Sequence, residues 1–132
     1  MTTTRIDSPV ALVADDDGVT RRVLSMLLER RGFQVLVAED GQEALHHVRT
    51  GRPSIVFLDA QMPAPDGYEV CRTIREERSA EPDPFVIMLT AAGQESDRRR
   101  AEAAGVNEFL TKPFSPSKLS TRLQQLSEAT AT

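Results

Sequence analysis

The sequence predicts an α/β protein with a doubly wound, five-stranded parallel sheet flanked by five helices. Short apolar runs of strand length alternate with stretches of helical period, which is the pattern of successive βαβ units. The run Ile55–Leu58 is apolar throughout, as expected of a parallel strand that is buried on both faces. Because crossovers between parallel strands are right-handed, helices should cover both faces of the sheet.

Each strand should be followed by its own helix. The first strand is expected at Val10–Ala14, and the helix that starts near Val19 carries Val23, Leu24, Leu27 and Leu28 on one apolar face. The later strands are expected at Gln34–Ala38, Ile55–Leu58, Phe85–Leu89 and Glu108–Thr111. The second helix should carry Ala44, Leu45 and Val48 on its apolar face, and the third should begin near Gly67. The fourth helix is expected at about Ser96–Ala104 and the fifth at Ser115–Ser127. Gly32 and Gly105 suit helix ends, since glycine tolerates the left-handed conformation there.

The chain of 132 residues has the size of one domain, which we expect over residues 10–127 between tails at 1–9 and 128–132. No linker or second core is visible in these residues, so we expect no attached DNA-binding or enzymatic domain. No apolar run approaches the roughly 18 residues of a membrane span, and the first residues lack the apolar core of a signal peptide. We therefore expect a cytoplasmic protein without membrane attachment.

The charge and composition argue against several kinds of binding partner. The net charge of −4 argues against direct binding to nucleic acid or anionic lipid. The basic run Arg98–Arg100 is flanked by acids and indicates a solvated helix face. Cys71 is the single cysteine and should simply pack in the core, while His46 and His47 lack a partner motif and at least one should be exposed.

Ionic or hydroxyl side chains follow four of the five predicted strands. They are Asp15, Asp16 and Asp17 after the first, Asp59 after the third, Thr90 after the fourth and Lys112 after the fifth. The carboxyl ends of parallel strands share one edge of the sheet, where such folds bind ligands. Two carboxylates ~4 Å apart repel by about 4 kcal/mol at an effective dielectric near 20, so a cation should join them. Hard oxygen ligands favour Mg²⁺, or Mn²⁺.

Two acidic positions have simpler interpretations. Asp17 is expected to cap the following helix, because two acids suffice at the metal and we assign those to Asp15 and Asp16. Asp66-Gly67 is expected to form a turn.

Four motifs in order resemble the response-regulator receiver domains of two-component signalling, of the stand-alone type. They are Val13–Asp17, Leu58–Pro63 with Asp66-Gly67, Leu89–Ala91 and Lys112–Phe114, and the resemblance covers nearly the whole chain. It implies a flavodoxin-like strand order, 2-1-3-4-5. It also implies a signalling domain that receives a phosphoryl group from a sensor histidine kinase or a histidine phosphotransfer protein. At most, such a domain catalyses its own phosphorylation and dephosphorylation.

The same resemblance assigns roles residue by residue. Asp59 would be the phosphoacceptor, and Asp15, Asp16, Asp59 and the backbone carbonyl of Gln61 would bind the metal. Thr90 would hydrogen-bond the phosphoryl group, and Lys112 would form an ion pair with it. The Lys112-Pro113 peptide would be cis and would orient the lysine.

The resemblance also predicts a switch. Thr90 and Phe109 would move on phosphorylation and alter the face of the fourth helix, fifth strand and fifth helix for a downstream protein target. The protein is expected to be a monomer or weak dimer. Phe109 stands where many relatives have tyrosine, and the Gln61 side chain could influence the lifetime of the phosphorylated form.

Three other functions share parts of this pattern. A haloacid-dehalogenase-type phosphatase needs a second acid where this chain has Gln61, and a flavin site needs a phosphate-friendly loop where Asp15–Asp17 would repel phosphate. The third is a receiver fold kept only as a protein-docking module with incidental phosphorylation, and the sequence leaves that alternative open.

Overall fold

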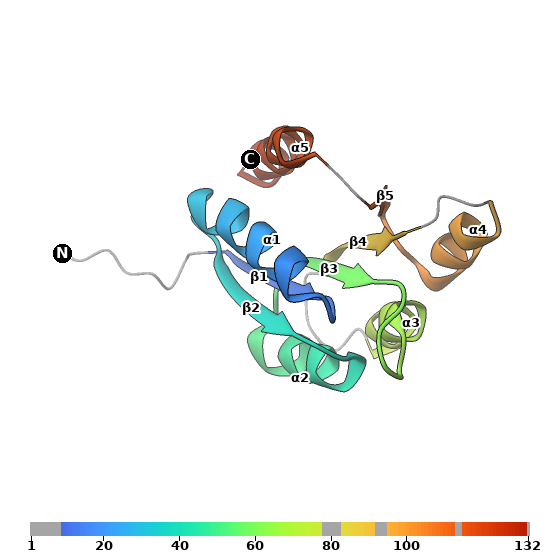
Figure 1. The fold of residues 1–132 in the computed structure, drawn as a ribbon. Helices are drawn as coiled ribbons and strands as arrows, with labels where there is room; N and C mark the ends of the chain where they lie inside the picture. The colour runs from blue at the N-terminus through green and yellow to red at the C-terminus, as the bar shows by residue number, and fades with distance from the viewer. Residues whose placement is uncertain (1–8, 78–82, 92–94, 113–114, 132) are drawn as a thin grey trace.

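The computed structural model describes residues 9–77, 83–91, 95–112 and 115–131, and its centre is a five-stranded parallel sheet (Figure 1). The strands are β1 (Val10–Ala14), β2 (Gln34–Ala38), β3 (Ile55–Asp59), β4 (Phe85–Thr90) and β5 (Glu108–Thr111). Their order is β2-β1-β3-β4-β5, with β1 paired to both β2 and β3. The predicted fold class and strand order are confirmed.

Five helices connect and follow the strands. They are α1 (Gly18–Arg30), α2 (Gly41–Gly51), α3 (Gly67–Glu77), α4 (Glu95–Ala104) and α5 (Pro116–Ala131). The last helix continues four residues past its predicted end near Ser127. The apolar periodicity stops at Leu126, but alanine and glutamate, which are good helix formers, follow it. The helix therefore continues beyond the last position of the apolar pattern.

Local hydrogen bonds explain where the helices begin. Asp17 is the N-cap of α1, as predicted, and its carboxylate accepts the backbone N–H of Thr20 at 3.1 Å. Asp66 was expected in a turn but instead caps α3 reciprocally with Glu69. The Glu69 N–H donates to Asp66 Oδ1, and the Asp66 N–H donates to Glu69 Oε1, both at 2.9 Å. Gly32 and Gly105 have φ of 89° and 94°, which confirms the predicted left-handed helix ends.

The sheet separates two apolar cores. On one face, side chains from α2, α3 and α4 pack on the even-numbered residues of β3, including Val56 and Leu58. On the other face, Leu24 and Leu28 of α1 and Leu119 and Leu123 of α5 pack on the odd-numbered ones. Figure 1 shows this layering, with the sheet between the two groups of helices. All five residues of β3 are buried, which confirms the burial that uniform apolarity predicted for Ile55–Leu58.

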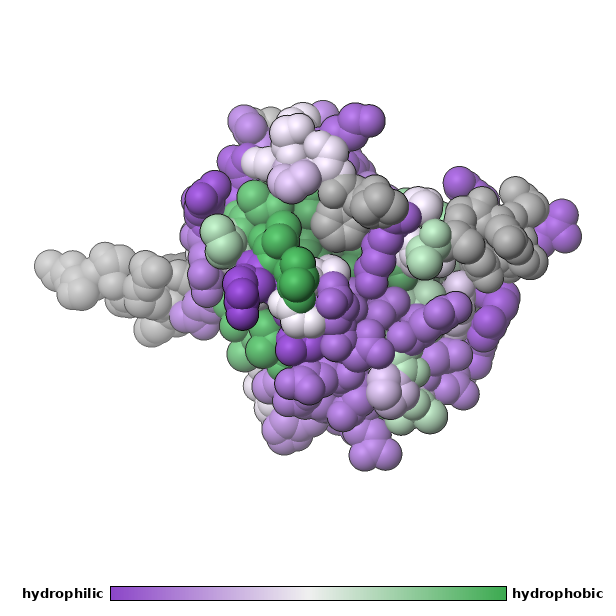
Figure 2. All heavy atoms as spheres, in the orientation of Figure 1, coloured by the Kyte–Doolittle hydropathy of each residue, from purple (hydrophilic) through white to green (hydrophobic). Residues whose placement is uncertain are grey.

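Part of the exposed surface is apolar. Figure 2 shows a mainly hydrophilic exterior with an apolar strip along α1, where Val19 and Met26 are exposed. Cys71 is buried, as predicted. Among the described residues, no helix is both long and apolar enough to cross a membrane.

Two glycines bring the loop after β3 close to its neighbours. A Cβ at Gly67 would lie 2.3 Å from the backbone oxygen of Asp59, and one at Gly41 would lie 1.9 Å from that of Pro65. Real Cβ atoms do not approach backbone oxygens so closely. The hydrogen atom of glycine therefore allows α3 and α2 to pack against the loop that follows Asp59.

Replacing Gly67 with alanine should destabilise the fold. Because the added methyl meets backbone, which cannot rotate away, the free energy of unfolding in urea should fall by about 2–3 kcal/mol. Gly18→Ala is the matched control, since the nearest atom to its Cβ would be Arg21 Nη2 at 3.5 Å. Equal stability of both variants would contradict the packing constraint at Gly67.

Candidate functional site

Strand register brings the predicted site residues to one edge of the sheet. Ala14 pairs with Leu58, so Asp15, which follows β1, and Asp59, the last residue of β3, lie side by side. Thr90 pairs with Thr111, which places Lys112 just beyond the end of β4. The Lys112 N–H donates to the Thr90 carbonyl at 2.6 Å and continues this pairing. The convergence predicted for the carboxyl ends of the strands is confirmed.

The ammonium of Lys112 lies between two carboxylates. Its Nζ is 2.7 Å from Asp15 Oδ2 and 3.6 Å from Asp59 Oδ2. The Asp15 side chain is fully buried, and the Asp59 side chain is 9% exposed. Burial removes the solvent that would otherwise screen these carboxylates, so the single ammonium is their nearest counter-charge.

Three carboxylates could hold a cation together. Asp15, Asp16 and Asp59 each offer an oxygen, and these oxygens lie within 4.8 Å of one another. Asp16 is exposed, which leaves the cluster open to solvent on one side. Asp15 Oδ2 is buried and accepts no hydrogen bond of normal geometry from the described residues, although Lys112 Nζ is near it. An all-oxygen set with an unsatisfied buried anion fits Mg²⁺ or Mn²⁺.

Burial governs the ionisation of this cluster. Desolvation is the main cause that raises the pKa of Asp59 to about 6, and the nearby Asp15 carboxylate adds to it. The Gln61 N–H, which donates to Asp59 Oδ1 at 3.1 Å, and the Lys112 ammonium act in the opposite direction. Burial alone would lower the pKa of Lys112, but ion pairing with Asp15 and Asp59 outweighs it and raises that pKa.

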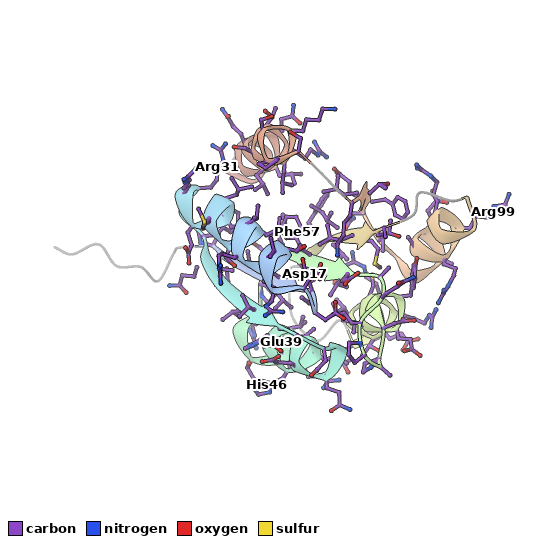
Figure 3. The ribbon with its side chains drawn as sticks, viewed as in Figure 1. Asp17, Arg31, Glu39, His46, Phe57 and Arg99 are labelled. Carbon is purple, nitrogen blue, oxygen red and sulfur yellow. The ribbon has the colours of Figure 1, made fainter. Side chains whose placement is uncertain are left out.

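The structure places the other predicted positions on several elements. Thr90 is buried at the end of β4. Phe109 is half-buried on β5 and packs against the core on the α2–α4 face of the sheet. Gln61 is exposed next to Asp59. The predicted cis peptide at Lys112-Pro113 lies outside the described residues. His46 is exposed, as expected of at least one of the two histidines (Figure 3).

Three arginines have contacts that the sequence did not predict. Arg98 and Arg100 are exposed, as expected of a solvated helix face, but their guanidinium groups lie 5.3 Å from the Phe109 ring centre and 4.1 Å from the Tyr68 ring centre. Arg100 also lies 3.6 Å from Asp66. Arg21 donates to the backbone carbonyl of Asp15 at 2.8 Å. No local pattern signals these contacts, because each partner lies on another element.

Comparison with known proteins identifies the class to which this fold and acidic site belong. The response regulator receiver domain model matches residues 11–124. The transcriptional regulatory protein ResD of Bacillus subtilis is 40% identical over 115 residues, which cover 87% of this chain and 46% of that protein. The probable transcriptional regulator ycf27 of Cyanophora paradoxa is 40% identical over 121 residues, with coverages of 92% and 49%. The chain thus spans about half the length of these curated relatives.

Solved structures agree with this match. The chemotaxis protein CheY4 of Vibrio cholerae superimposes with a TM-score of 0.81 at 29% identity, covering 89% of this chain and 98% of that one. The BeF3-activated DrrB receiver domain gives 0.81 at 30% identity, with coverages of 92% and 98%. The chain therefore belongs to the response regulator receiver domain family of two-component systems. Receiver domains are signalling domains rather than conventional enzymes, and they interact with histidine kinases and downstream effectors.

The raised pKa of Asp59 predicts a specific pH dependence of stability. The folded protein holds the proton of the Asp59 carboxyl group more tightly than the unfolded chain, in which the pKa of this group is 3.8. The resulting contribution to stability is complete below that value and is lost as the pH rises through about 6. Without metal, Asp59→Asn should therefore be more stable than the wild type near neutral pH, by on the order of 2 kcal/mol. The difference should shrink toward about pH 4.

Urea unfolding of both proteins in the presence of EDTA, across this pH range, measures that difference directly. Comparing variant with wild type cancels the titration of all groups that the substitution leaves alone. A stability difference that does not change with pH would contradict the assignment of the shift to Asp59.

Proposed function

We propose that this receiver domain is the phosphoacceptor response regulator of a two-component phosphorelay, with Asp59 as the acceptor. The observation that supports it best is the position of Asp59. Its carboxylate ends the central strand, lies 3.6 Å from the Lys112 ammonium, and shares a cluster with Asp15 and Asp16. Structural packing alone does not account for three acids and a lysine meeting at a solvent-accessible edge.

The chemistry follows from these groups. A carboxylate oxygen of Asp59 attacks phosphorus on a phosphohistidine of a sensor kinase or histidine phosphotransfer protein. The new O–P bond forms as the N–P bond breaks, and the departing imidazole nitrogen takes a proton. With a pKa of about 6, Asp59 is mostly ionised at neutral pH and available as the nucleophile. Lys112 offsets the negative charge that accumulates beside it.

The cation site would contribute to the same reaction. Asp15, Asp16 and Asp59, together with the backbone carbonyl of Gln61, would hold Mg²⁺ or Mn²⁺. The metal supplies charge neutralisation for the phosphoryl oxygens, which makes attack by one anion on another feasible. In the described structure the ammonium of Lys112 is closer to Asp15 than to Asp59, so cation binding would free it to pair with a phosphoryl group on Asp59.

Phosphorylation would then act on α4 and β5. Thr90 and Phe109 follow the strand alternation of Met88 and lie on the face of the sheet that α4 covers. Among the α4 side chains that the structure describes, the buried apolar ones are Ala101 and Ala104, and Arg98 and Arg100 add contacts to Phe109 and Tyr68. A helix anchored so lightly can shift when Thr90 and Phe109 move, which would change the α4, β5 and α5 face for a downstream protein.

The remaining assignments rest on charge and composition. The net charge of −4 favours a protein target over direct contact with nucleic acid or a membrane. We propose that the domain acts in the cytoplasm as a monomer or weak dimer, and that its covalent chemistry is limited to self-catalysed phosphoryl transfer and autodephosphorylation.

The acceptor assignment predicts the result of a phosphorylation assay. Incubation with acetyl phosphate and Mg²⁺ should add one phosphoryl group to the wild type and none to Asp59→Asn, as measured by intact mass. EDTA should abolish the addition, because the carboxylate cluster would then lack its cation. Wild-type protein that stays unmodified would instead favour the receiver fold as a docking module, and equal modification of both proteins would move the acceptor elsewhere.

The switch predicts which amides respond to a phosphoryl mimic. Beryllofluoride with Mg²⁺ should move the NMR shifts of backbone amides in α4 and β5, including Arg98, Arg100 and Phe109, because these residues contact the moving elements. Asp59→Asn under the same conditions is the control, and its spectrum should not change. Unmoved amides over residues 96–126 in the wild type would show that this face is not coupled to the acceptor.

A further inference from the structure

Arg21 connects two loops at the rim of the acidic site. It lies near the start of α1, and its Nη1 donates to the backbone carbonyl of Asp15 at 2.8 Å. Its Nη2 lies 3.7 Å from Glu39, the residue that follows β2. The Arg21 side chain is 21% exposed, whereas that of Glu39 is 71% exposed. The bond to Asp15 is the better shielded of the two contacts and should dominate.

This hydrogen bond completes the restraint of Asp15. The strand ends at Ala14, and beyond it the Asp17 N–H donates to Asp15 Oδ1 at 2.9 Å while Lys112 Nζ lies 2.7 Å from Oδ2. The backbone carbonyl of Asp15 belongs to the peptide that joins Asp15 to Asp16. Rotation of that peptide would turn the exposed Asp16 carboxylate away from Asp15 and Asp59.

We propose that Arg21 is a positioning residue for the cation site. Its guanidinium fixes the Asp15–Asp16 peptide, so that the Asp16 carboxylate stays within reach of Asp15 and Asp59. The inference rests on the proposed function, because it takes the carboxylate cluster to be a site for a divalent cation. Arg21 offers no ligand oxygen and acts through the backbone carbonyl of Asp15.

Positioning and simple electrostatics predict opposite effects of removing Arg21. A guanidinium near the cluster repels a divalent cation, so charge alone would make Mg²⁺ bind more tightly once the arginine is gone. Loss of positioning would make Mg²⁺ bind more weakly, because the Asp16 ligand would no longer be held in place. Residues that orient metal ligands typically change affinity by about 10–100-fold when they are mutated. The sign of the change therefore separates the two explanations.

The test compares Arg21→Met with Arg22→Met in the full 132-residue chain. Both variants remove one positive charge from adjacent positions of α1, and Arg22 is exposed. Mg²⁺ is titrated at constant ionic strength and followed by the amide NMR shifts of Asp59 and Ala60. We expect the Kd to rise about tenfold in Arg21→Met and to stay level or fall in Arg22→Met. Urea unfolding without Mg²⁺ reports whether each variant remains folded.

Each result decides the inference. An unchanged or lower Kd in Arg21→Met overturns it, even if that variant is less stable, since a purely structural role would change unfolding and not affinity. An equal rise in both variants also overturns it, because general charge or helix effects would then be responsible. If Arg21→Met does not fold, Arg21→Gln repeats the test, because the glutamine amide nitrogen lies two bonds short of the position of the arginine Nη1 that donates to Asp15.

Asp16→Ala identifies a failure at the level of the proposed site. Mg²⁺ affinity should fall strongly in this variant, because it lacks a ligand. If the wild type binds no Mg²⁺, or if Asp16→Ala binds as the wild type does, the proposed cation site is wrong and the inference about Arg21 falls with it. If both behave as expected and Arg21→Met binds normally, only the inference about Arg21 is wrong.

Discussion

The repulsion among three carboxylates at one edge of the sheet is the constraint on which the rest of the site depends. Asp15 and Asp59 are buried at neighbouring strand ends, where water cannot screen them, and Asp16 completes the cluster. The Lys112 ammonium, 2.7 Å from Asp15, offsets only part of this charge. The folded protein therefore holds an electrostatic strain that a divalent cation would relieve, which connects ligand binding directly to stability.

That strain is consistent with a site kept for function. A protein selected only for stability would replace Asp59 with a neutral residue, since burial raises the pKa of this carboxyl to about 6. The same burial leaves the Asp59 side chain only 9% exposed, 3.6 Å from the ammonium of Lys112. The contribution of Asp59 to stability is thus lower near neutral pH, where its carboxyl group is mostly ionised.

The two faces of the sheet divide the tasks of such a domain. Asp15 and Asp59 follow the strand alternation of Val13 and Phe57, whose side chains pack under α1 and α5. Thr90 and Phe109 follow that of Met88, on the face covered by α2, α3 and α4. The end of β4 therefore lies between the acidic rim and the face of the sheet that α4 covers. Among the side chains of α4 that the structure describes, two buried alanines and the exposed arginines make its contacts, so this part of the helix has little apolar anchoring.

The sequence by itself determined the strands, the helices and the acidic rim, because each depends on local periodicity or on a residue that directly follows an apolar run. Asp15, Asp16, Asp59 and Lys112 could be found in this way, since parallel strands bring their carboxyl ends to a common edge. Only the tertiary structure decided the contact of Arg21 with Asp15, the stacking of Arg100 on Tyr68 and the close approach of Gly67 to Asp59. The end of α5 was predicted four residues too early, because the apolar periodicity of the helix stops at Leu126. These features depend on distances between separate elements, which neither composition nor periodicity encodes.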